Sequence, residues 1–195
     1  MDVSKLGGFF QILLNQLHLK RKQNPEEFSR RYGVKWDRTI LMLGSGEDRM
    51  EGIVSHALRE FAGGAEPRFE KYGDAWVQGG DSWWDGKELT LLTVEVENRL
   101  AELKGTVGDL LRKQAHGKIG IFYQDHPDLA ERWRHVKEVF EYFSTMGFAE
   151  AEATPYLIIF GPEAMDQPDG IGEWCAMVFT SKDITSDTSS FVSLP

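Results

Sequence analysis

The chain has 195 residues, a formal net charge of −9 and a hydrophobic content of 41%. This length suits one compact domain, and the ordinary globular composition excludes a disordered chain or a collagen-like fibre. The negative charge argues against loose, charge-driven binding to nucleic acid, although a local basic strip or an acidic metal site stays compatible with it. The single cysteine, Cys175, excludes a disulfide framework within the chain and a zinc site made of several cysteines.

No apolar run approaches the roughly 18 residues that a membrane span needs, and the N-terminus lacks the basic and apolar regions of a signal peptide. We therefore expect a cytoplasmic protein that makes no membrane contact. The last residues, 181–195, include seven Ser or Thr and are expected to form a tail. The preceding residues 1–180 are expected to form a single domain.

Residues 1–45 are predicted to form a helical extension of that domain. Apolar side chains recur at helical spacing over residues 5–20. Asn24 followed by a proline is typical of the start of a helix, and Gly33 ends this second, short helix. Residues 39–43 fit either an apolar strand or a lead-in to the next helix.

A further helix is predicted over residues 47–62, with Ser45 as its N-cap and an apolar stripe along one side. The Gly-Ser-Gly sequence at residues 44–46, between an apolar segment and this helix, can also be interpreted as a nucleotide-binding loop. Glu47 and Asp48 would repel a phosphate at this helix N-terminus, and no Walker lysine follows. We therefore interpret this sequence as a helix cap and expect no nucleotide cofactor.

From residue 68 the spacing of apolar residues changes to two, which is typical of strands. Turn-forming glycines divide this stretch into a three-stranded antiparallel meander over residues 68–71, 75–78 and 89–96. Downstream, the pattern predicts a helix over residues 100–115, a buried strand over residues 118–123, a helix over residues 128–146 and strands over residues 156–160 and 174–180. An α/β fold with one mixed sheet and helices on both faces accommodates this order.

The last strand of the meander carries the informative carboxylates. Alternate residues of a strand share a face, so Glu95 and Glu97 point to one side and the apolar residues to the other. Two carboxylates in a covered layer need a partner such as a cation, and Mg²⁺ prefers oxygen ligands of this kind. Asp81, across the preceding turn, can reach the same point. The alternative is a solvated strand face with both glutamates in water.

A helix, a meander that ends in Glu-x-Glu, a helix and a buried strand, over residues 46–125, together resemble the core of the PD-(D/E)XK (restriction endonuclease-like) nuclease superfamily. The Val-Glu-Val-Glu-Asn sequence is similar to uncharacterised members whose third strand ends in Glu-x-Glu-Asn. The resemblance implies a three-layer core and metal-dependent phosphodiester hydrolysis, with DNA as the expected substrate. It assigns Asp81 and Glu95 to the metal, with Mg²⁺ or Mn²⁺ as the cofactor.

The chain departs from the family pattern at two points. Gly80 stands where a proline precedes the first acid, and Glu97 stands where the family has a lysine that positions the attacking water. The resemblance leaves three candidates for orienting that water: Glu97 itself, Glu51 on the first core helix, and Lys104 at the edge of the following helix. The simpler alternatives are a surface glutamate for Glu51 and an ammonium in water for Lys104.

Four basic residues are expected to contact the phosphate backbone of a nucleic acid, and two tryptophans are candidates for stacking on bases. These residues are Arg49, Arg68, Lys71, Arg99, Trp83 and Trp84. Paired tryptophans at a turn also occur as plain packing. Nucleic acid and a second copy of the chain are the candidate partners. The alternative function is a catalytically inactive protein that keeps the nuclease fold as a binding module.

Overall fold

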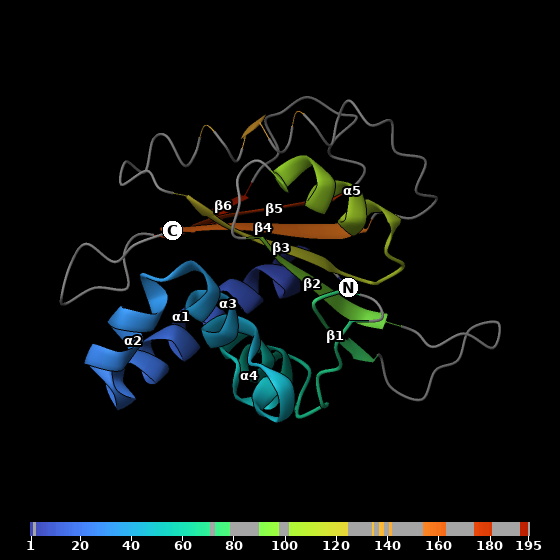
Figure 1. Ribbon diagram of the computed structural model, residues 1–195. Helices are drawn as coiled ribbons and strands as arrows, with labels where there is room; N and C mark the ends of the chain where they lie inside the picture. The colour runs from blue at the N-terminus through green and yellow to red at the C-terminus, as the bar shows by residue number, and fades with distance from the viewer. Residues whose placement is uncertain are drawn as a thin grey trace.

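The computed structural model describes residues 1, 3–70, 73–78, 90–97, 102–124, 134, 137–138, 141, 154–162, 174–180 and 192–194. Within them one mixed sheet carries helices on both of its faces, which is the predicted α/β class (Figure 1). The helices are α1 (Val3–Gln23), α2 (Pro25–Tyr32), α3 (Lys35–Leu43), the 3-10 helix η1 (Gly46–Glu51), α4 (Ile53–Phe61) and α5 (Leu103–Arg112). The strands are β1 (Ala75–Gln78), β2 (Thr90–Glu97), β3 (Lys118–Gln124), β4 (Pro155–Pro162), β5 (Cys175–Thr180) and β6 (Val192–Leu194). No helix in this part of the chain is both long enough and apolar enough to cross a membrane.

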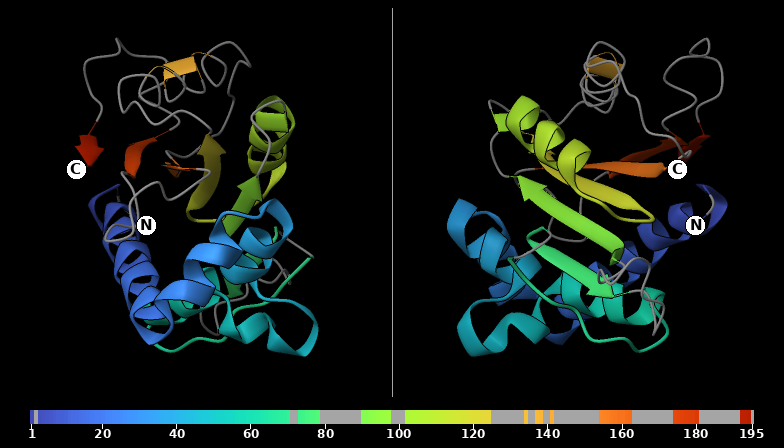
Figure 2. Two further views of the ribbon diagram at one scale, coloured as in Figure 1. Left: turned by 60° about the vertical axis from the view of Figure 1, so that its left-hand side comes forward. Right: turned by 90° about the vertical axis from the view of Figure 1, so that its right-hand side faces the viewer.

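The described strands follow one another through the sheet in the order β1-β2-β3-β4-β5-β6. β1 pairs antiparallel with β2, whereas β2, β3 and β4 are parallel neighbours. β5 and β6 each pair antiparallel with the strand before them. Parallel neighbours need a crossover, and α5 lies between β2 and β3 in the chain. The carboxyl ends of the three parallel strands therefore lie at one edge of the sheet (Figure 2).

α1 and α4 cover one face of the sheet (Figure 1). α1 forms a helix with a wide apolar stripe, because its apolar residues recur at three- and four-residue spacing. The fully buried members of this stripe are Leu6, Phe9, Phe10, Leu13 and Leu17. They belong to one core with Leu58 of α4 and with Val94 and Ile121 of the sheet. Burying each such side chain contributes roughly 1.5–3 kcal/mol, so this core is a main source of stability.

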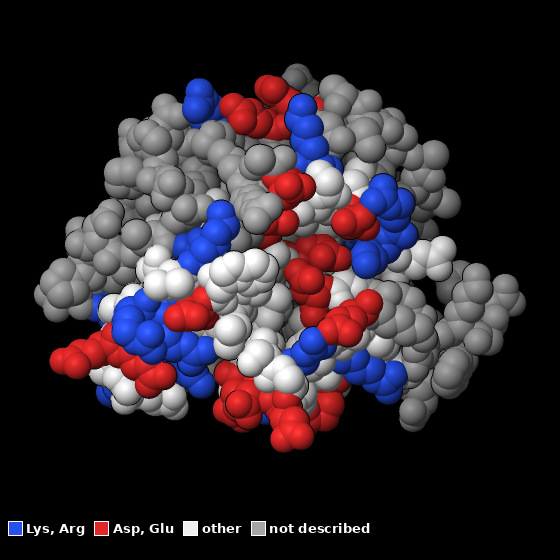
Figure 3. All heavy atoms as spheres, viewed as in Figure 1, with Lys and Arg blue, Asp and Glu red and all other residues white. Residues whose placement is uncertain are grey.

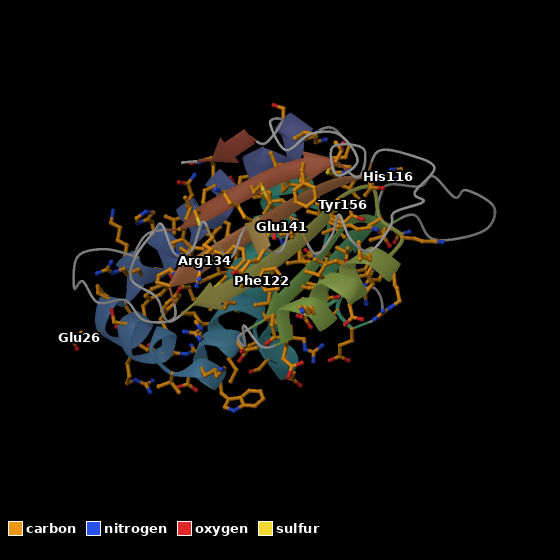
Figure 4. All side chains as sticks on the ribbon, turned by 90° about the horizontal axis from the view of Figure 1, so that it is seen from above. Glu26, His116, Phe122, Arg134, Glu141 and Tyr156 are labelled. Carbon is orange, nitrogen blue, oxygen red and sulfur yellow. The ribbon has the colours of Figure 1, made fainter. Side chains whose placement is uncertain are left out.

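α5 covers the opposite face, where Val107 and Leu110 pack in a second core with Phe122 and Tyr156. Figure 4 looks down on this face and labels Phe122 of β3 and Tyr156 of β4. Gly120 permits the close approach of the helix. A side-chain carbon at Gly120 would lie 3.0 Å from Leu110 Cδ1 and 2.7 Å from a ring carbon of Phe122. The absence of a side chain there therefore sets how closely α5 rests on the sheet.

The strands predicted from continuous apolar runs are confirmed. β3 contains residues 118–123, and β4 contains residues 156–160 and is buried at all eight of its positions. β4 lies between β3 and β5, so both of its edges are hydrogen-bonded. Such runs are typical of strands that are covered on both faces. The predicted start of α2 is also confirmed, because the Asn24 side chain accepts a hydrogen bond of 3.2 Å from the backbone N–H of Glu27.

In the segment between α2 and β1 the structure differs from two expectations. Residues 39–43 belong to the helix α3 and not to a strand. The helix predicted over residues 47–62 is divided at Gly52 into η1 and α4, and Ser45 makes no side-chain cap. The physical reason is a close backbone approach, because a side-chain carbon on Gly52 would lie 2.4 Å from the carbonyl carbon of Leu43.

The meander is shorter than predicted. In place of the strand over residues 68–71, the described part of the chain has one isolated bridge between Arg68 and Trp76. Glu70 adopts a positive φ of 70°, which turns the chain out of the extended conformation and explains why pairing ends there. The antiparallel pair β1–β2 that follows agrees with the prediction, with Ala75 opposite Val94.

The C-terminal part corrects the expectation of a plain tail. β6 lies within residues 181–195 and pairs antiparallel with β5, so part of the segment extends the sheet. Pairing with a distant strand, which the Ser- and Thr-rich composition does not reveal, decides this outcome. Most of the helix predicted over residues 128–146 lies outside the described residues, and those described within it are helical.

Candidate functional site

Glu95 and Glu97 lie in the carboxyl-terminal half of β2 and point to the side of the sheet that α5 covers. The pairing shows this, because Glu95 lies opposite Gly120 in the parallel ladder and Gly120 faces Leu110 of α5. Both glutamates are half-buried, and only 12% of the Glu95 side chain is exposed. The alternation predicted from the sequence is therefore confirmed, and a fully solvated strand face is wrong for Glu95.

Asp74, which lies between the first two predicted strands of the meander, is the acid that lies beside Glu95. Because Ala75 pairs with Val94 in an antiparallel ladder, Asp74 and Glu95 come next to each other on the adjacent strands. The Asp74 carboxylate is fixed there, since its Oδ2 accepts a hydrogen bond of 2.8 Å from the backbone N–H of Val96. The half-buried Asp74 thus lies directly before β1, and its carboxylate is fixed on the backbone of β2.

The environment favours the protonated form of both acids. Burial raises the pKa of Glu95 to about 7, with the neighbouring Asp74 carboxylate as the next cause. Burial also raises the pKa of Asp74, against the hydrogen bond from Val96, and the charge of Glu97 adds to the increase. Asp109 of α5 raises both pKa values further. This part of the protein therefore carries more negative charge than its local environment stabilises, and a cation would relieve it.

One cation of the chain partly meets this need. The Nζ of Lys113, directly after α5, lies 3.5 Å from Oε1 of Glu95 and holds the pKa of that carboxyl below the value that burial alone would give. Lys104, which the sequence analysis selected, is exposed near the start of the same helix. Glu97 is held from another side, because the hydroxyl of Thr106 lies 3.4 Å from its Oε2 as a donor.

Among the other predicted site residues, those that the structure describes are not brought together with these carboxylates. Glu51 is exposed at the end of η1, where its Oε2 lies 3.6 Å from Nε2 of His56. The exposed Arg68 lies 5.3 Å from the Trp76 ring centre. Arg49 forms an ion pair with Glu70 and lies over the ring of Phe69, so its guanidinium already has protein partners. The remaining predicted residues lie outside the described part of the chain, namely Lys71, Asp81, Trp83, Trp84 and Arg99.

Acidic side chains gather along the middle of the face drawn in Figure 3, between α5 and the helices on the other side of the sheet, with basic side chains on either side. Among the described residues, no three His, Cys, Asp or Glu side chains are close enough together to hold a metal ion. The pair Asp74 and Glu95 nevertheless fits Mg²⁺, which usually takes one or two protein carboxylates and keeps several waters. All donors of this pair are oxygens, and burial, together with the neighbouring carboxylates, raises the pKa of both acids.

A surface pocket of about 240 Å³ lies elsewhere, between α1, α2 and α3. Its lining includes Lys20, Glu27 and Arg31, and none of the acidic residues described above contributes to it. In comparisons with known proteins, the chain matches no family model, no curated protein and no solved structure.

Proposed function

We propose that the chain is a Mg²⁺-dependent nuclease of the restriction endonuclease-like type, with Asp74 and Glu95 as the metal-binding acids. The observation that carries the proposal is the placement of these two half-buried acids, side by side on adjacent strands with raised pKa values. The element order supports it, since an antiparallel pair is followed by a helix and a strand parallel to the second of the pair. Asp74 takes the role that the sequence analysis gave to Asp81.

The residues around the pair have separable tasks. When bound, the metal ion supplies positive charge at the phosphate and lowers the pKa of a water molecule. Asp74 is fixed by the Val96 N–H and holds its carboxylate at the beginning of β1. Lys113 supplies the ammonium that the family pattern places on the strand, because its Nζ lies 3.5 Å from Glu95. Glu97, restrained by Thr106, orients the attacking water.

Proton binding and metal binding compete at Glu95. A carboxylate must lose its proton before it can bind a cation, and the pKa of Glu95 is about 7 in the metal-free protein. Metal affinity should therefore rise steeply between pH 6 and pH 8. A site made of ordinary surface carboxylates would be fully ionised over this range and would show no such change.

The test is a cleavage assay on plasmid and single-stranded DNA with Mg²⁺ or Mn²⁺, together with a thermal shift on adding either ion. We compare wild type with Asp74→Asn and Glu95→Gln, which remove charge and keep shape. We expect each variant to lose at least a hundredfold in cleavage rate, since each removes a metal ligand. The metal-induced rise in melting temperature should disappear with it.

Glu66→Gln is the matched control, because Glu66 is an exposed glutamate whose described partner is Arg59. It lies outside the carboxylate cluster, by which we mean Asp74, Glu95 and Glu97. It should cleave and bind metal as wild type does. Equal cleavage by wild type and both cluster variants would contradict the nuclease proposal. So would a metal-induced thermal shift that the variants retain in full.

One observation favours a second function, that of an inactive nuclease-like binding module. The Lys113 ammonium neutralises part of the cluster without a metal ion, and Glu97 stands in place of the family lysine. An inactive module would show no cleavage and no metal-induced thermal shift in wild type. The same two measurements therefore separate the two functions.

A further inference from the structure

The N-terminal helices present an apolar surface that the rest of the described chain does not cover. Trp36 of α3 is 75% exposed, and Ile40 lies one helical turn further along on the same side. Val34, just before the helix, is also exposed. A large aromatic side chain gains from burial, so one left in water on a rigid helix commonly marks a binding surface. We call Val34, Trp36 and Ile40 the Trp36 surface.

This surface lies in the basic part of an acidic chain. Residues 20–40 contain seven Lys or Arg and three Asp or Glu, although the whole chain has a net charge of −9. Lys35 is exposed next to Trp36 in the sequence. The exposed side chain of Arg30 reaches from α2 to α3, where its Nη1 lies 3.9 Å from Oδ2 of Asp37. Positive charge therefore borders the Trp36 surface.

α2 and α3 are anchored at the edge of the sheet where the parallel strands end. The hydroxyl of Tyr32 donates a hydrogen bond of 2.7 Å to the carbonyl oxygen of Pro162, at the end of β4. The buried guanidinium of Arg38, on α3, lies 4.5 Å from the ring centre of Tyr123, near the end of β3. Glu95 lies toward the same end of the neighbouring β2. The Trp36 surface is thus carried by helices at the end of the sheet that holds the carboxylate cluster (Figure 1).

We propose that the Trp36 surface binds single-stranded nucleic acid, with a base stacked on Trp36 and phosphates held by Arg30 and Lys35. This inference rests on the proposed function, since it names the substrate whose backbone the carboxylate cluster would cleave. A single strand fits because its bases expose their faces to an aromatic side chain, whereas duplex bases are already stacked. A second copy of the chain fits less well, because it would bring two basic surfaces together.

The test measures binding without metal, so that it does not depend on cleavage. Fluorescence anisotropy with labelled oligothymidylate and with a DNA duplex of equal length, in EDTA at low salt, gives the affinities. Trp36→Ala should weaken single-strand binding about fivefold to a hundredfold, which is the usual effect of losing one stacked base. Trp36→Phe should stay within about threefold of wild type because it keeps a stacking face. Lys35→Gln should lower the slope of log affinity against log salt by about 0.7, since it loses one phosphate contact.

Leu19→Ala is the control, because it truncates an exposed apolar residue on α1 outside the Trp36 surface; it should bind as wild type does. Melting temperatures should be equal for all four variants. Unchanged affinity in Trp36→Ala, or tighter binding of duplex than of single strand, would overturn the inference. So would a dimer, seen by light scattering, that Trp36→Ala dissociates. If oligothymidylate binds through Trp36 and cleavage is absent, the binding surface stands while the nuclease proposal fails.

Discussion

β4 and β2 are both long strands of the same sheet, yet they differ in what covers them. β4 is buried at every position, between two hydrogen-bonded neighbours and under apolar side chains on both faces. β2 is mostly buried in its first half and half-buried from Glu95 to its end. The apolar run of β4 predicts its position directly, whereas β2 changes character at Glu95.

The cause of the difference is the amphipathic helix α5. Val107 and Leu110 cover β3 and β4, but the neighbouring surface of the same helix is polar, with Thr106 beside Glu97. Directly after the helix, Lys113 lies beside Glu95. A buried carboxylate costs free energy unless it is paired. The contacts with Thr106 and Lys113 offset this cost only in part, since the pKa of Glu95 stays raised. The fully buried apolar side chains thus lie in the middle of the sheet, whereas the partly paired ionisable groups lie toward one side of it. This division can be tested by comparing mutations in the two strands.

The largest expected effect is on stability, at β4. Ile158→Ala removes a fully buried side chain of the core under α5 and should lower the free energy of unfolding by about 2–5 kcal/mol. Val96→Ala, at a half-buried position of β2, should cost about 1 kcal/mol or less. Urea unfolding followed by circular dichroism measures both. Equal losses of unfolding free energy at the two positions would show that the two strands do not differ in this way.

The second effect is a gain of stability that depends on pH. The pKa of Glu95 in the folded protein, about 7, lies above its ordinary value of about 4.5. The folded state therefore binds this proton more tightly, and stability falls as the pH rises from about 4.5 through 7. Glu95→Gln keeps the shape without the charge, so it should stabilise the metal-free protein at pH 8 by up to about 3 kcal/mol and change little at pH 4.5. A gain that is independent of pH would show that Glu95 is not held in an unfavourable environment.

The third effect concerns the approach of α5 to the sheet. Gly120→Ala would place a carbon against Leu110 and Phe122 and should cost about 1–3 kcal/mol. Gly105→Ala is the matched control, because a carbon there meets nothing within 4 Å and alanine favours the helix. The control should gain about 0.5–1 kcal/mol. Thermal unfolding of both variants, at one pH, separates packing under the helix from helix propensity.

The elements that local sequence decides are predicted well. Apolar runs of a few residues predict β3 and β4, and the proline after Asn24 predicts the start of α2. Strand alternation likewise predicts that Glu95 and Glu97 share a face. The division of the helix at Gly52 depends on contact with Leu43, and β6 depends on pairing with β5, so neither is visible in the local pattern.

The candidate site was predicted only in part, because some of its residues also come together through contacts that the local sequence does not reveal. Asp74 follows a glycine and looks like a turn residue, yet the pairing of Ala75 with Val94 makes it the neighbour of Glu95. Its signal in the sequence is an acid directly before a short apolar strand, a pattern that many surface turns share. Lys113 reaches Glu95 because of the path of the chain after α5, and that path depends on tertiary packing. Sequence alternation therefore finds one of the paired acids, and the strand register finds the other.

The smallest expected effect isolates the ion pair between Lys113 and Glu95. Lys113→Gln removes the ammonium, so the pKa of Glu95 should rise further above its ordinary value. At pH 8, where Glu95 is mostly ionised, the variant should be less stable than wild type by about 0.5–1 kcal/mol. At pH 5, where Glu95 is mostly protonated, the loss should be smaller, with any remainder due to Asp74, whose pKa Lys113 also lowers. Lys104→Gln should show no pH-dependent loss. In the background of Glu95→Gln, the same lysine change should cost less at pH 8 than it does in wild type, and the difference measures the pair, because Lys113 also lowers the pKa of Asp74 and keeps that interaction in both backgrounds. A loss that is equal at both pH values would mean that Lys113 stabilises the end of α5 and does not act through the carboxylate.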